Sequence, residues 1–536
     1  MPPKPLAEGC AIIRIRNPLD MVVRKRAGTL FAKFSFGIPY GLHCHTVAEE
    51  IKTLCNRHLQ ATPDPDLLSD EWRFFRRHML TWAGKLGCTT PVPLKNLLDG
   101  KSGRRRRRFY SGILTYKERG YHHRDSILKE MQKLEFYAED LIPIKEDRGI
   151  QYRSLVFNIA NGRFIRALEQ HMAGWHINVG GIEFHPCSKG ITPAQIASRL
   201  FTLASKFRKP VFGNVDHSRY DAHFHKHLCK LVNKCNKKRC RYDPEFCRTA
   251  DDSIRGRGFT EGGVEYKITG KRKSGDPETS YSNSWAQIFL LWSFFKFYGI
   301  VKFVFQVIGD DAWVCVEEED SWVLDLMPEF MLKLGFVTEL QIVRDIFKVE
   351  FCQMRPVILP GGVTMVRNPF KVAGTIGQTP GVRNALDMQG VVRSSCLSEL
   401  AMGPGTPIST PLAKKLLREL GPGRVFKTAK QAYKEDAYGF KIEEVEPDLV
   451  PEPDEMARIT MWRAWDIDPG YQVILENEGP VYMAKLVDDR KRKVVGEPST
   501  QVDPRDISCE LDMDMGGFEN PHCGCGNCPQ YPDDVK

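Results

Sequence analysis

The stretch FVFQVIGDDAWVCVEE, residues 303–318, places two adjacent carboxylates, Asp310 and Asp311, between two apolar runs. The runs VFQVI and AWVCV are rich in β-branched and aromatic residues, and Gly309 lies between them, which predicts two strands joined by a tight turn. Two like charges in an apolar setting are costly to ionise. The pair is therefore either ordinary hairpin-turn chemistry or a site for an ion of high positive charge.

The whole chain has the composition of a globular protein with several subdomains. It has 536 residues, 42% hydrophobic and 27% charged, and a formal net charge of +10. The positive charge is concentrated in two runs, RRRRR at residues 104–108 and KCNKKRCR at residues 234–241. Such runs are either solvated faces or contacts with phosphates.

The cysteines and the apolar runs indicate the compartment. The 16 cysteines follow no disulfide spacing and no signal peptide begins the sequence, so we expect reduced thiols in an intracellular protein. The most apolar run, residues 286–308, is interrupted by polar residues and predicts a buried helix followed by a buried strand rather than a membrane span. Near the C-terminus, HCGCGNC (His522, Cys523, Cys525 and Cys528) is either a zinc-ligand cluster or part of a mobile tail.

A second stretch, PVFGNVDHSRYDAHFH, ends an apolar strand-like run at Asp216, with Asp221 five residues later. Carboxylates at a strand end are well placed to bind a cation at a sheet edge. Combined with Asp310 and Asp311, they form a site that needs divalent ions for neutrality. Hard oxygen ligands suit Mg²⁺ or Mn²⁺, and two such ions are the usual apparatus for in-line phosphoryl transfer.

Two further stretches surround this carboxylate group in the sequence. In KSGDPETSYSNSWAQ, Thr279 and Asn283 are four residues apart and share a helix face; they either begin a capped helix or recognise a ribose. Upstream, Lys145, Arg148 and Arg153 form a basic segment that can clamp a triphosphate. Each pattern is weak alone, but the four together in this order predict a nucleotidyl-transfer site.

These stretches, taken in order, resemble a viral RNA-dependent RNA polymerase of the tombusvirus-like group. The segments KEDRGIQYR, DHSRYD, SGDPETSYSN and GDD match the family's successive motifs, and the full S-G-x3-T-x3-N pattern is the most specific. Downstream, KVEFCQMRPV, TMVRNPFK, SSCLSELAMGPGTPI and ARITMWRAWDIDPGYQVILE are also similar to that group. The resemblance covers roughly residues 100–480.

The resemblance implies an α+β right-hand fold with fingers, a palm built on an antiparallel sheet flanked by helices, and a largely helical thumb. We expect the following divisions of the chain: an N-terminal extension with fingers elements at 1–100, fingers with the basic nucleotide-entry segment at 101–209, the palm at 210–355 with a fingers insertion near 230–272, the thumb at 356–480 and a C-terminal tail at 481–536.

The resemblance also implies roles for individual residues. Asp216 and Asp310 would bind two Mg²⁺ ions, or Mn²⁺ in their place, with Asp311 assisting. Asp221 and Asn283 would recognise the ribose with support from Thr279; Ser274 and Gly275 would form a mobile loop near the template; and Lys145, Arg148 and Arg153 would hold the triphosphate. The RNA 3′-OH would attack the α-phosphorus of a nucleoside triphosphate (NTP) and release pyrophosphate. The family's general acid has no convincing counterpart here, since Arg344 and Lys348 both lie off the expected position.

Two alternatives differ from this interpretation. A reverse transcriptase shares the paired aspartates but usually has an aromatic residue where this chain has Gly309. A non-enzymatic, basic RNA-binding or capsid protein would explain the arginine run but would leave the carboxylates without a purpose. The expected partners are template and nascent RNA, NTPs, other viral replication proteins and host membranes, in replication complexes of the host cytoplasm. The mode of initiation, the template specificity and the oligomeric state stay open.

Overall fold

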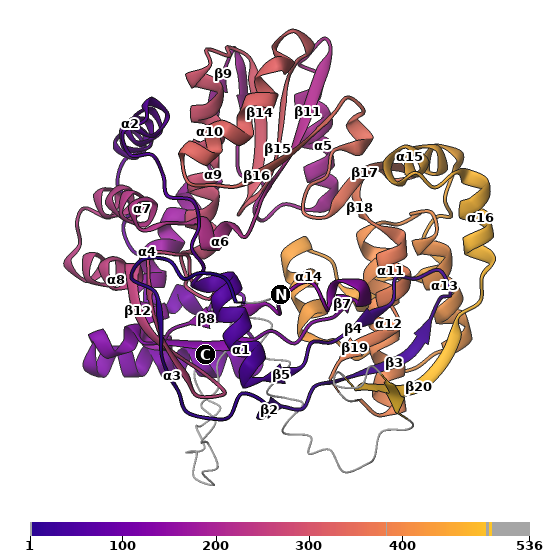
Figure 1. Ribbon diagram of the computed structural model, residues 1–536. Coiled ribbons are helices and arrows are strands. Elements are labelled where there is room, and N and C mark those ends of the chain that lie inside the picture. The colour runs from indigo at the N-terminus through magenta and orange to yellow at the C-terminus, as the bar shows by residue number, and fades with distance from the viewer. Residues whose placement is uncertain (1–2, 382, 489–492, 496–536) are drawn as a thin grey trace.

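The computed structural model describes residues 3–381, 383–488 and 493–495, which form a mixed α+β fold (Figure 1). Its central sheet has four antiparallel strands in the order β14-β15-β11-β16. The bounds are β11 (Pro210–His217), β14 (Phe303–Ile308), β15 (Asp311–Glu317) and β16 (Thr338–Val343). The predicted hairpin at residues 303–318 is confirmed, and the α+β class with it.

The strand-forming runs of this sheet are buried because helices cover them. Helix α9 (Thr279–Phe297) packs on β14, and α10 (Met327–Lys333) packs on β16. On its other side α9 contacts α2 (Asp70–Lys85), so Trp285, Phe289 and their neighbours are buried in the main core. The helix-then-strand interpretation of residues 286–308 is therefore confirmed. No helix in the described part of the chain has the length and apolar character needed to cross a membrane.

A five-stranded sheet lies beside the central one, in the order β1-β13-β12-β6-β8. Only the β12–β6 pair is parallel. Its strands are β1 (Ala11–Ile15), β6 (Leu128–Gln132), β8 (Gly149–Tyr152), β12 (Arg255–Thr260) and β13 (Val264–Thr269). Four helices accompany it: α3 (Gly103–Arg119), α4 (Leu155–Ala173), α7 (Lys226–Arg239) and α8 (Pro244–Ile254). Residues near 230–272 thus join elements from residues 101–209.

The C-terminal half combines helices with a third sheet, in the order β19-β3-β20-β21. Its strands are β3 (Ala27–Lys33), β19 (Gln378–Pro380), β20 (Val481–Asp488) and β21 (Lys493–Val495), and its helices are α11 (Pro369–Thr375), α12 (Ala385–Met402), α13 (Ser409–Leu420), α14 (Ala429–Tyr438), α15 (Glu455–Trp465) and α16 (Pro469–Asn477). The prediction that a tail begins at residue 481 is wrong, because residues 481–488 pair with β3. The proposed zinc ligands at residues 522–528 lie outside the described residues.

Short elements connect these three parts. The hairpin of β17 (Met354–Leu359) and β18 (Gly362–Arg367) packs between α5 (Pro193–Ala204) and α15. The remaining short pieces are β2 (Val22–Arg24), β4 (Tyr40–Gly41), β5 (His45–Thr46), β7 (Tyr137–Ala138), β9 (Ile177–Val179), β10 (Ile182–Phe184), α1 (Val47–Thr53) and α6 (Tyr220–His223).

The first hundred residues are divided between two parts of the molecule. Strand β1 extends the five-stranded sheet through β13, whereas β3 lies between β19 and β20 in the third sheet. In Figure 1 the indigo N-terminal chain accordingly runs along the bottom of the view, from the left-hand part to the right-hand part. The N-terminal region therefore ties the two flanking parts together and is not a separate extension.

Candidate functional site

The β14–β15 turn holds two of the predicted carboxylates. Ile308 pairs with Asp311, so the turn itself consists of only Gly309 and Asp310. Gly309 has φ +66° whereas Asp310 does not lie in the left-handed region, which is the pattern of a type II′ hairpin turn. The Gly309 N–H donates to the Ser284 Oγ at 2.8 Å. The turn is thereby fixed to helix α9.

Asp216 reaches the same end of the sheet from β11. Val215 pairs with Ala312 across β11 and β15, so the next residue along β11, Asp216, faces Asp311 on the neighbouring strand. On its other side Asp216 pairs with Glu339 of β16. The structure therefore brings Asp216 next to Asp310 and Asp311, from which it is separated by more than ninety residues in the sequence.

The charges of these carboxylates are poorly compensated by the protein. Burial, followed by Asp310, Asp216 and Glu350, raises the pKa of Asp311 to about 7, against a weaker lowering by a hydrogen bond with Cys352. Burial also raises the pKa of Asp310, with Asp216 adding to the rise and Arg148 opposing it. Both side chains are nevertheless exposed at the end of the sheet. Water and ions can therefore reach these carboxylates on their solvent side, while protein atoms surround them on the other side.

The three carboxylates fit divalent cations whose remaining coordination positions are filled by oxygens from water or a phosphate group. Within the part of the chain that the structure describes, no group of three or more His, Cys, Asp or Glu side chains is arranged to hold a metal by itself. Mg²⁺ retains several water or phosphate oxygens and takes only one or two protein carboxylates. Adjacent, accessible and poorly compensated carboxylates meet this lower demand.

Replacing Asp311 by asparagine should raise the stability of the metal-free protein at high pH. The folded chain keeps a proton on Asp311 up to about pH 7, whereas the unfolded chain releases it near pH 4. The folded state binds more protons in this interval, so stability falls as the pH rises through it. Since solvent screens part of the repulsion, we expect a gain of about 1 kcal/mol at pH 8 that vanishes at pH 4.

Thermal melts in EDTA from pH 4 to 8 would measure this difference. The matched control is Asp325→Asn, an exposed carboxylate in the segment that follows the far end of β15. Equal pH dependence of wild type and Asp311→Asn would contradict the expected repulsion.

Asp221 and Asn283 form a polar pair beside the carboxylates. Asp221 lies on α6, which follows the left-handed residue Arg219, and Asn283 lies on the first turns of α9. The Asn283 Nδ2 donates to the Asp221 Oδ1 at 2.9 Å, while the Asn283 Oδ1 is buried without a partner. Burial and then Asp310 raise the pKa of Asp221 to about 6. The pair therefore places a buried acceptor without a partner next to a carboxylate of raised pKa.

Thr279 does not point its hydroxyl proton toward this pair. Its Oγ1 donates to the backbone oxygens of Lys273 at 2.8 Å and Asp276 at 3.0 Å. Thr279 thus shapes the loop before α9, which is a support for Asn283 rather than a contact with a ligand.

Ser274 and Gly275 pack against strand β8. The Gly275 N–H donates to the Gln151 oxygen at 2.8 Å, and the Gln151 N–H donates to the Ser274 Oγ at 3.3 Å. A Cβ on Gly275 would lie only 2.6 Å from the Gln151 oxygen, so only glycine allows this approach. The loop is therefore fixed to the strand that follows Arg148.

The basic segment is divided by the structure. Lys145 and Arg148 are exposed, and Arg148 is close enough to Asp310 to lower its pKa. Arg153 is different: its side chain is fully buried and its Nε donates to Asp276 at 2.9 Å. The prediction that Arg153 contacts a triphosphate is wrong, because all its nitrogens are engaged inside the protein.

Comparison with protein families identifies the group to which this arrangement belongs. A family model described as viral RNA dependent RNA polymerase matches residues 25–482. The chain belongs to this family. The match includes every predicted site residue in the described part of the chain and extends over the N-terminal segment that lacked any recognised motif.

The viral polymerase family contains relatives named RNA-directed RNA polymerase. The one from tobacco necrosis virus (strain D) is 25% identical over 82% of this chain and 62% of its own length. The one from melon necrotic spot virus is 25% identical over 75% of this chain and 52% of its own length. The one from tomato bushy stunt virus (strain Cherry) is 28% identical over 53% of this chain and 35% of its own length. The chain thus spans about half the length of the relatives it matches.

The polymerase-family site includes residues that the sequence motifs did not reveal. Arg57 and Arg219 both pair with the buried Glu146, at 3.4 and 3.0 Å, and Arg57 lowers the pKa of Asp221. Arg219 stands inside the DHSRYD segment and could have been suspected, whereas Arg57 lies in a region without a motif.

The two residues considered as general acid, Arg344 and Lys348, are both held in ion pairs. Arg344 forms an ion pair with Glu318 at 2.9 Å. It directly follows Val343, which pairs with Phe212 at the end of the sheet far from Asp216. Lys348 is bound to Asp466 at 2.6 Å. Neither side chain extends toward the carboxylates, so we assign no general acid.

Proposed function

We propose that this chain is an RNA-directed RNA polymerase that replicates a viral RNA genome from NTPs on an RNA template. The observation that carries the proposal is the meeting of Asp216, Asp310 and Asp311 at one end of an antiparallel sheet, next to the Asp221–Asn283 pair. Membership of the viral polymerase family supports the same conclusion.

The three parts of the fold correspond to the subdomains of a right hand in this proposal. The central sheet with α9 and α10 is the palm, the five-stranded sheet with α3, α4, α7 and α8 belongs to the fingers, and the third sheet with α11 to α16 is the thumb. The N-terminal hundred residues contribute strands to both fingers and thumb, and residues 481–488 belong to the thumb.

Asp216 and Asp310, with Asp311 assisting, are proposed to hold two Mg²⁺ ions, which Mn²⁺ can replace. When bound, such ions activate the RNA 3′-OH and stabilise the oxygens of the leaving pyrophosphate. The support is the carboxylate set itself, which is exposed and poorly compensated, with Arg148 lowering the pKa of Asp310 against the stronger effect of burial. The fixed turn at Gly309 then holds Asp310 in place relative to α9.

The remaining residues are proposed to position the incoming nucleotide. Arg148, exposed near Asp310, and Lys145, exposed three residues earlier in the chain, bind the triphosphate, and Asp221 with the unpartnered Asn283 Oδ1 accepts the 2′-OH of the ribose. Ser274 and Gly275 lie near the template strand. Template and nascent RNA are thus the main partners, and we propose that other viral replication proteins and host membranes join them in cytoplasmic replication complexes.

The decisive experiment is an assay of the purified chain with an unprimed RNA template, labelled NTPs and Mg²⁺. Template-length RNA made from NTPs, and lost on chelation of Mg²⁺, is the expected result. Preferred use of dNTPs would indicate a reverse transcriptase, and salt-sensitive RNA binding without synthesis would indicate a non-enzymatic binding protein.

Replacing Asn283 by alanine should weaken the choice of NTPs over dNTPs. The change removes both the donor to Asp221 and the buried Oδ1 acceptor to which we assign the ribose 2′-OH. We expect the ratio of kcat/KM for NTP to that for dNTP to fall by ~10-fold, which is the effect of about one hydrogen bond to a charged or buried group.

The matched control is Ser293→Ala, a buried hydroxyl without a partner on the same helix. It lies about 15 Å further along α9, at the 1.5 Å rise of a helical residue. An unchanged ratio in Asn283→Ala would remove Asn283 from sugar recognition.

A further inference from the structure

The loop before α9 is strongly charged in sequence but buried in the structure. Its residues KRKSGDPE, 271–278, include three cations and two anions. All five charged side chains belong to buried residues: Lys271, Arg272, Lys273, Asp276 and Glu278. Buried charges persist only where partners satisfy them, so this loop must be held by specific contacts.

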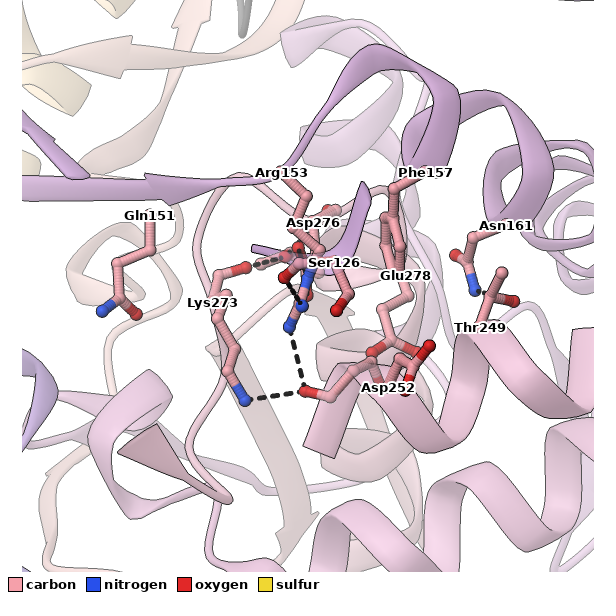
Figure 2. A network of polar contacts seen from close by, with 12 residues as sticks. Ser126, Gln151, Arg153, Phe157, Asn161, Thr249, Asp252, Lys273, Asp276 and Glu278 are labelled. Carbon is pink, nitrogen blue, oxygen red and sulfur yellow. Dashed lines mark hydrogen bonds and ion pairs between the residues drawn. The ribbon is translucent and has the colours of Figure 1, made fainter. Parts of the chain in front are cut away.

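Arg153 of β8's C-terminal extension supplies the central contact. Its Nε donates to the two Asp276 carboxylate oxygens at 2.9 and 3.2 Å, and its Nη1 and Nη2 donate to the backbone oxygens of Ser126 and Ser253 at 2.5 and 3.2 Å. Figure 2 shows these bonds converging on the guanidinium beneath Phe157, whose ring lies 4.8 Å from it. Arg153 therefore has one partner in the loop and two in the surrounding fingers.

Two further buried groups fix the same loop. The Lys273 ammonium, on the left of Figure 2, donates to the backbone oxygens of Ser253 and Ile254 at the end of α8, and to that of Gly270. Arg272 pairs with Glu278 at 2.5 Å. The loop is thus attached to α8 on one side and to the β8 segment on the other, where the Arg153–Asp276 ion pair adds to the hydrogen bonds of Ser274 and Gly275 with Gln151.

The positions of Arg148 and Asn283 show what this link connects. Arg148 immediately precedes β8, and Asn283 lies on the first turns of α9, shortly after Asp276. Arg153 ends the strand segment and Asp276 precedes the helix. The ion pair therefore joins the strand that presents the phosphate-binding arginine to the helix that presents the ribose-binding asparagine.

We propose that Arg153 and Asp276 are positioning residues that set the spacing between the triphosphate site and the ribose site. This inference rests on the proposed function. The pair makes β8, the Ser274–Gly275 loop and the start of α9 move as one body. A displacement of about 1 Å between reacting groups can cost ~10²-fold in rate. We therefore expect a weakened Arg153–Asp276 pair to raise the KM for NTPs.

The test compares Arg153→Lys and Asp276→Asn with wild type in NTP kinetics and in amide hydrogen exchange. Lysine keeps the charge but loses the planar fork, and asparagine keeps the shape but loses the charge. We expect the KM for NTPs to rise about tenfold in both variants, with a smaller change in kcat. Exchange should become faster together in peptides covering residues 149–153 and 273–279, because each segment donates an amide bond to the other.

The matched control is Arg458→Lys, which loosens a similar two-bond pair, Arg458–Glu476, between α15 and α16. It should lower thermal stability without changing KM. An unchanged KM in a folded Asp276→Asn, or faster exchange confined to the mutated segment, would overturn the inference. A wild type that makes no RNA would instead refute the proposed function, and the exchange experiment would still test the link.

Discussion

Asp310→Asn should abolish RNA synthesis while the protein stays folded. Asp310 is the second residue of a two-residue turn and is exposed at the end of the sheet. An amide cannot replace a carboxylate as a ligand for Mg²⁺ at full strength. Removing a metal ligand takes away several kcal/mol of transition-state stabilisation, which corresponds to a loss of ~10³-fold or more. The melting temperature should stay the same or rise, because burial and Asp216 disfavour the charge.

The control for this prediction is a carboxylate on β16, at the other edge of the same sheet. Glu339 pairs with Asp216 across β11 and β16 and is exposed at the same end of the sheet, but we do not assign it as a metal ligand. Glu339→Gln should therefore retain most of the activity. If Asp310→Asn synthesised RNA at the rate of Glu339→Gln, the carboxylate turn would have no part in catalysis.

Arg148→Ala should raise the KM for NTPs by ~10- to 100-fold. Arg148 is 56% exposed, with only a 3.5 Å pairing to Glu135, and its effect on Asp310 places it near the carboxylates. One lost charge-assisted hydrogen bond costs about 1.5–3 kcal/mol, and each 1.4 kcal/mol is a factor of ten. Because the guanidinium is exposed, its loss should leave the folded state intact.

Arg344→Ala tests whether this effect is specific to the position. Arg344 is 64% exposed and likewise pairs with a single glutamate, Glu318, but it stands at the opposite end of the sheet. Steady-state kinetics at several NTP concentrations should show an unchanged KM for Arg344→Ala. An equal increase in both variants would mean that only the overall positive charge matters.

The central fold was predictable because its signals are local. The apolar runs around Gly309 and Asp310, with a glycine where the turn needs positive φ, specify the hairpin within sixteen residues. Asp216 was found through its place at the end of a strand-forming run. The S-G-x3-T-x3-N pattern located Asn283 on a helix start, and its hydrogen bond to Asp221 agrees with that interpretation.

The failed predictions concern contacts between distant segments. In the sequence Arg148 and Arg153 are two equivalent arginines of one basic segment. Arg153 is buried because it pairs with Asp276, far along the chain, whereas Arg148 is exposed. Burial of a cation depends on such a partner and leaves no local pattern. For the same reason the sequence did not reveal Arg57, whose partner Glu146 lies 89 residues away in the loop before β8, or the pairing of residues 481–488 with β3.

The third sheet has a consequence for how the protein is made. Val481 pairs with Lys33, and β3 is hydrogen-bonded to β19 on its other edge. Almost 450 residues separate Lys33 from Val481, so during synthesis β3 must wait for residues 481–488 before it can pair with one of its two neighbours. Closing so long a loop makes this pairing late and slow. The third sheet is therefore completed only after residues 481–488 have been synthesised.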